Sequence, residues 1–166
     1  MREKIGILFP TIDHSQRVYE FTMSAHRLLD QYSNVDIVSF YESINNPFIV
    51  QKFGSAHVSS MLSFNGTLIA TDAKSARRIS GVITSKRKVF YVMDLEWKTT
   101  PPLPYEFLAG VYRDPSLEVV ARSESHAWAL SNGFNINPPI VKDFNLELLC
   151  LKQNTSSQEN IYTNNT

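Results

Sequence analysis

The chain has 166 residues, and its sixteen basic and sixteen acidic side chains give a formal net charge of zero at pH 7. This length suits one domain with a sizeable core, and the balanced charge argues against a role in coating nucleic acid. The single cysteine, Cys150, rules out an internal disulfide and fits a reducing compartment. No stretch reaches the ~20 apolar residues of a membrane helix, and the N-terminal apolar run is too short for a signal peptide. These features predict a soluble, cytoplasmic protein without membrane partners.

The first half of the chain reads as strand, helix, strand. Residues 4–9 form a continuous apolar run, as in strands buried on both faces of a parallel sheet. Apolar residues recur at helical spacing from Val18 to Tyr32, and 35–41 is a second apolar run. This order predicts a right-handed crossover between parallel strands. Residues 44–66 are expected to be loop around Pro47, with SAHVSSML as a candidate short helix.

The second half alternates strands and helices in the same way. Strands are predicted at 67–72, 88–97, 117–122 and 140–144, and helices at 73–79, 105–112, 123–133 and from 146 onward. Asp72 and Ser123 are suited to cap their helices, and Gly133 to end the second of these. The prediction is an α/β fold: a single Rossmann-like three-layer domain over residues 1–151, with a mostly parallel, doubly wound sheet of about six strands. Residues 152–166 are polar and are predicted to be a disordered tail.

Polar side chains follow the predicted strands at their carboxyl ends, where open parallel sheets bind ligands. Asp94 and Glu96 fall two residues apart at the end of one strand. Because side chains alternate along a strand, their carboxylates are expected to share one face and could hold Mn²⁺ or Mg²⁺ over a diphosphate. The alternative is a pair of solvated loop residues. Trp97 beside them would stack on a sugar or cover the sheet edge.

The next strand end carries Arg122 and Ser123, followed by His126 on the first turn of a helix. A guanidinium, a hydroxyl and free helix N–H groups can capture a phosphate or carboxylate, and His126 could act as a base. The alternative is that Ser123 only caps the helix, while Arg122 pairs with Asp94 or Asp143.

The loop after the first strand, PTIDHSQ, contains no glycine. Dinucleotide sites need glycines here, so that the backbone can approach a pyrophosphate. Asp13 and His14 offer side-chain hydrogen bonds instead, which would suit the hydroxyl groups of an acceptor. The histidines share no zinc-ligand spacing.

The segments YVMDLEW, VVARSESHAWALSNGF and PIVKDFNLELL together resemble the N-terminal Rossmann-like half of retaining GT-B-type glycosyltransferases, in a short single-domain form like those of tailed phages. The resemblance covers most of residues 4–149. It departs from the family in the glycine-free loop after the first strand and at Met93, where the family has histidine. It implies Asp94 and His126 as catalytic candidates, and Asp13, His14, Arg122, Ser123 and Asp143 as substrate-binding candidates.

The resemblance further implies a sugar or glycoconjugate acceptor and a nucleotide-sugar donor. The expected function is that of a half-enzyme whose donor domain comes from a partner chain or a second copy, in the host cytoplasm if the gene belongs to a phage. Two alternatives stay open: a small metal-dependent enzyme using Asp94 and Glu96, and a non-enzymatic protein-binding module.

Overall fold

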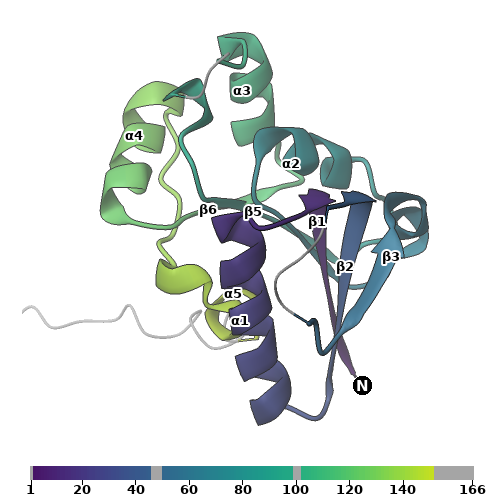
Figure 1. Cartoon of the computed structure of the whole chain (residues 1–166). Coiled ribbons are helices and arrows are strands. Elements are labelled where there is room, and N and C mark those ends of the chain that lie inside the picture. The colour runs from purple at the N-terminus through teal and green to yellow at the C-terminus, as the bar shows by residue number, and fades with distance from the viewer. Residues whose placement is uncertain (1, 46–49, 99–101, 152–166) are drawn as a thin grey trace, which may run out of the picture.

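The computed structural model describes residues 2–45, 50–98 and 102–151. Strands and short helices alternate along these residues (Figure 1). The elements in chain order are β1 (Glu3–Ile12), α1 (Gln16–Gln31), β2 (Val35–Ile44), β3 (Gly54–His57), the 3₁₀ helix η1 (Val58–Ser63), β4 (Thr67–Ala70), α2 (Ala73–Ser80), β5 (Arg87–Val92), the 3₁₀ helix η2 (Glu96–Lys98), α3 (Tyr105–Tyr112), β6 (Glu118–Ala121), α4 (Glu124–Phe134), the 3₁₀ helix η3 (Lys142–Phe144) and α5 (Leu146–Cys150).

The strands form one six-stranded sheet in the order β3-β2-β1-β4-β5-β6. Every neighbouring pair is parallel. This is the strand order of Rossmann-type domains, in which the direction of winding reverses between the first and fourth strands. The predicted α/β class and doubly wound parallel sheet are therefore confirmed.

Two apolar cores lie on opposite faces of the sheet. On one face, α1 and α5 pack against β1 through buried side chains such as Phe21, Leu146 and Leu149. On the other face, α2, α3 and α4 pack through Ile79, Leu108 and similar residues. Figure 1 shows α1 beside α5 on one side of the strands. The domain thus has three layers, helix–sheet–helix. Helices cover both faces of the sheet, so a polar site is expected at the ends of the strands.

Both predicted helix caps are confirmed. The Asp72 carboxylate accepts a hydrogen bond from the Ser75 backbone N–H at 2.9 Å, and the Ser123 hydroxyl accepts one from the His126 N–H at 3.3 Å. The end of α4 differs from the prediction. Gly133 lies inside the helix, and Asn135 is the left-handed residue that ends it, with φ 55°. Asparagine tolerates this conformation because its short side chain can bond locally.

The sixth strand is not where the sequence predicts it. Residues 140–144 make only one bridge, between Ile140 and Ala121, and then turn into η3 with Asp143 and Phe144 at positive φ. The missing strand is β3, a short edge strand beside β2 in a region predicted to be loop or helix. The predicted short helix, SAHVSSML at 55–62, is confirmed only for 58–62, which belong to the 3₁₀ helix η1.

Pro47 and the predicted tail at 152–166 lie outside the described residues. Within the described ranges, no helix is both long and apolar enough to cross a membrane.

Candidate functional site

A pocket of about 360 Å³ lies at the carboxyl ends of β5 and β6. Side chains from the segment after β5, from the end of β6 and from the first turn of α4 meet here. The lining residues are Met93, Asp94, Leu95, Lys98, Arg122 and His126. Three of the predicted site residues, Asp94, Arg122 and His126, are thus brought to one place.

Asp94 does not pair with Arg122. It accepts a hydrogen bond from the Arg17 guanidinium at 3.3 Å, and the same guanidinium lies 3.5 Å from Asp72. Arg17 therefore links the carboxyl ends of β4 and β5 from the first turn of α1. The Asp94 side chain stays 54% exposed, so its carboxylate can also receive a ligand.

Arg122 is held mainly by the backbone. Its guanidinium donates to the Met93 carbonyl at 3.2 Å and lies 3.9 Å from the Glu20 carboxylate. A long ion pair of this kind, between partly exposed groups, contributes little stability. These contacts orient the Arg122 side chain, and other N–H groups of its guanidinium can still donate hydrogen bonds to a ligand.

The His126 ring lies 2.8 Å from the Ser123 hydroxyl through Nδ1. Burial, and then the charge of Arg122, lower the pKa of His126 below its ordinary value. A neutral imidazole is therefore favoured near pH 7, and it can accept a proton. Ser123 bonds to His126 but is not among the residues that line the pocket.

Glu96 is placed differently from the prediction. β5 ends at Val92, so the alternation of a strand no longer applies at Asp94 and Glu96. Glu96 is 8% exposed, and its Oε1 accepts a hydrogen bond from the Ala73 backbone N–H at 2.8 Å. This carboxylate binds the start of α2, and the joint Asp94–Glu96 metal face is not formed. In the part of the chain that the structure describes, no group of three or more His, Cys, Asp or Glu side chains is placed to hold a metal ion.

Burial raises the pKa of Glu96 to about 7, and the neighbouring charges of Asp72 and Asp94 add to the rise. The Ala73 hydrogen bond and Arg17 act in the opposite direction but are outweighed. Burial first, and then the Glu96 charge, also raise the pKa of Tyr112. Glu96 is thus a buried carboxyl group whose pKa is raised into the neutral range.

Asp13, His14 and Asp143 do not line this pocket. Asp13 accepts a hydrogen bond from the Ser15 backbone N–H at 2.9 Å and closes the turn between β1 and α1. Burial opposes ionisation of Asp13, but the Ser15 hydrogen bonds and the nearby Arg17 leave its pKa lowered. His14 and Asp143 are exposed side chains on the segments after β1 and β6.

The point where the sheet reverses its winding lies between β1 and β4. Rossmann-type domains bind a pyrophosphate there through glycines of the turn after the first strand and free N–H groups of the helix that follows, which is α1 here. The turn before α1 has no glycine. On the other side of the crevice, the first N–H group of α2 is bonded to Glu96, and the carboxylate of Asp72 lies beside it. Arg17 is held between Asp72 and Asp94. These carboxylates oppose a diphosphate at this position.

Sequence reasoning missed Arg17, Glu20 and Lys98. Arg17 and Glu20 have the spacing of ordinary solvent-facing residues on the polar face of a helix. Their position beside the strand ends results from the way α1 connects β1 to β2, which the local sequence does not reveal. Comparisons with protein-family models, with curated proteins and with solved structures gave no match. The site is therefore interpreted from its own chemistry.

Proposed function

We propose that this protein is a glycosyltransferase-like half-enzyme. Its role is to present the pocket at the ends of β5 and β6 to a sugar or glycoconjugate acceptor. The nucleotide-sugar domain comes from outside this domain, from a partner chain or a second copy. The observation that supports this most is the meeting of Asp94, Arg122 and His126 around one pocket of about 360 Å³.

The chemistry of the pocket suits a sugar ring. Sugar hydroxyls both donate and accept hydrogen bonds. Asp94 accepts, Arg122 donates, and a neutral imidazole such as His126 can do both. Met93 and Leu95 add apolar surface for the face of a ring, and the volume lies in the roughly 300–1,000 Å³ range of small-molecule sites.

Two groups could receive a proton from an acceptor hydroxyl. Asp94 offers an exposed carboxylate, and His126 offers an imidazole whose lowered pKa favours the neutral form. A general base must reach the proton it removes, and both side chains border the same space. These are the candidate catalytic residues.

The half-enzyme part of the proposal rests on the β1–β4 crevice. The loop after β1 lacks glycine, and Asp72, Asp94 and Glu96 surround the start of α2 with carboxylates. A nucleotide diphosphate in this crevice would lie near these carboxylates, without the glycine turn that lets the backbone before α1 approach it. A donor site supplied by another domain removes this conflict.

Changing Arg122 to glutamine is expected to weaken saccharide binding by about 10–150-fold, because a hydrogen bond to a charged group contributes about 1.5–3 kcal/mol. The measurement is a titration of a panel of methyl glycosides, followed by ligand-observed NMR. Lys142→Gln, an exposed cation that does not line the pocket, is the control and should leave the affinity unchanged.

Thermal melting should show that both variants stay folded, because Arg122 is partly exposed. Equal glycoside affinity of wild type and Arg122→Gln would contradict the proposal. So would the absence of binding to every glycoside in the panel.

A further inference from the structure

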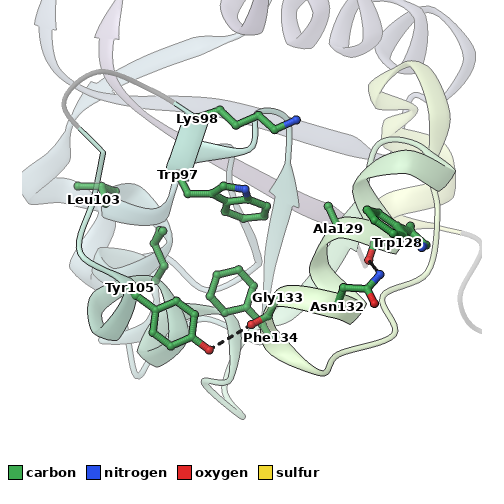
Figure 2. Close-up of a pocket in the computed structure, with 10 residues that line it drawn as sticks. Trp97, Lys98, Leu103, Tyr105, Trp128, Ala129, Asn132, Gly133 and Phe134 are labelled. Carbon is green, nitrogen blue, oxygen red and sulfur yellow. Dashed lines mark hydrogen bonds between the residues drawn. The ribbon is translucent and has the colours of Figure 1, made fainter.

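A second cavity, of about 410 Å³, lies between η2, α3 and α4. Its lining is almost entirely apolar, unlike that of the strand-end pocket. Figure 2 shows the rings of Trp97 from η2, Tyr105 from α3 and Phe134 from α4 close to one another, with Trp128 set apart from them on α4. Its size lies within the roughly 300–1,000 Å³ range of small-molecule sites.

The aromatic wall is fixed in place. Tyr105 stacks on Phe134 at a centroid distance of 5.5 Å and an interplanar angle of 12°. The Tyr105 hydroxyl donates to the Gly133 carbonyl at 3.1 Å (Figure 2). Trp97 packs against the same Phe134 at 5.3 Å. A flat ligand therefore meets rings that need little ordering on binding.

Trp128 lies at the rim of the cavity and is 71% exposed. A large aromatic side chain beside an apolar hollow is a feature of binding sites. Asn132, one turn further along α4, donates a hydrogen bond to the Trp128 carbonyl at 2.9 Å. This bond supports the backbone that carries the ring.

Lys98 gives the cavity a charge. It lines both this cavity and the strand-end pocket, and its charge contributes to lowering the pKa of His126. Lys98 is the one charged side chain among the described residues that line this cavity. An anionic group on a ligand would be favoured there.

We infer that this cavity binds a small amphipathic anion: a flat aromatic ring system that carries a carboxylate, sulfonate or phosphate. The rings lie among Trp97, Tyr105, Trp128 and Phe134, and the anion faces Lys98. This function goes beyond the proposed acceptor site, because the apolar cavity can be filled whether or not the strand-end pocket binds a sugar.

The test compares two dyes on the whole chain. 8-Anilinonaphthalene-1-sulfonate carries the anion, and N-phenyl-1-naphthylamine has the same rings without it. Both tryptophans of the chain line this cavity, so quenching of intrinsic fluorescence reports on this site directly. Saturable binding of the sulfonate with tryptophan quenching is expected.

Three variants separate the contributions. Trp128→Ala should lower the affinity for both dyes by about tenfold, as is typical when an aromatic side chain of a binding site is truncated. Lys98→Gln should weaken only the sulfonate, by about two- to fivefold, since an exposed ion pair contributes little. Ile83→Ala, an exposed apolar residue elsewhere on the surface, should change neither dye. Unchanged melting curves identify binding to the folded state.

The inference is overturned if wild type and Trp128→Ala bind the dyes equally, or if Lys98→Gln weakens both dyes alike. It is also overturned if sedimentation shows that the chain self-associates and that Trp128→Ala abolishes this association, because the rim would then be an interface between copies. None of these results depends on glycoside binding, so a failure here is distinguishable from a failure of the acceptor site.

Discussion

Replacing Phe144 with alanine is expected to lower the free energy of unfolding by about 3–5 kcal/mol, the usual cost of deleting a buried phenyl ring. Phe144 is fully buried and packs edge-on against Tyr91, with ring centroids 4.5 Å apart, and against Phe21 at 5.9 Å. It thereby joins η3 to β5 and α1. Urea denaturation followed by circular dichroism measures the change.

Leu148→Ala is the matched control, because Leu148 lies on the neighbouring helix α5 but is 39% exposed. Its expected cost is below about 1 kcal/mol, since little apolar surface leaves the core. If Phe144→Ala cost no more than this control, the packing described for the C-terminal segment would be wrong.

Changing Glu96 to glutamine is expected to alter how stability depends on pH. In the folded protein the pKa of Glu96 is raised from 4.5 to about 7. The folded state therefore holds a proton that the unfolded state releases. The resulting stability is fully present below pH 4.5 and is lost as pH rises through 7. The loss is about 3 kcal/mol, at about 1.4 kcal/mol for each unit of pKa difference.

Glutamine cannot ionise, and its carbonyl oxygen can still accept the Ala73 N–H. The free energy of unfolding of Glu96→Gln relative to wild type should therefore rise by about 3 kcal/mol between pH 4 and pH 8. The lowered pKa values of His26 and His126 act in the opposite direction, but they do so in both proteins and cancel in the difference. Glu124→Gln, at an exposed position, is the control. A flat difference would show that Glu96 is not held in this buried environment.

Strands could be predicted from the sequence where their apolar pattern reflects burial alone. The apolar runs that became β1, β4 and β5 are buried on both faces, and this pattern is visible without coordinates. Helix starts were equally readable, since Asp72 and Ser123 act on backbone groups only three residues away.

The missed strand β3 shows the limit of this reasoning. Its sequence, Gly-Ser-Ala-His, has no apolar alternation, and it is held by pairing with β2 at the edge of the sheet. The 140–144 segment is the opposite case: its sequence is apolar like that of a strand, but Val141 and Phe144 are buried where the chain turns at Asp143 and Phe144, without a strand being formed. Local patterns do not distinguish these cases.

The location of the site could be predicted from the sequence, but the ion pairs of its side chains could not. Strand ends correctly placed Asp94, Arg122 and His126 together. The partner of Asp94 is Arg17, 77 residues away, and no local pattern identifies such a pair. The Asp94–Glu96 spacing was misread because the strand ends at Val92, two residues before Asp94.

The central claim is that this domain binds an acceptor at the ends of β5 and β6 and lacks its own donor site at the β1–β4 crevice. The most direct test is a backbone amide NMR titration of the ¹⁵N-labelled chain, with a methyl glycoside and a nucleotide sugar added to parallel samples. The account predicts glycoside-induced shifts at Asp94, Arg122 and His126, and no nucleotide-induced shifts at Asp13, Arg17 and Ala73. Saturable nucleotide-sugar shifts at Arg17 and Ala73, with the β5–β6 pocket unaffected by glycosides, would contradict it.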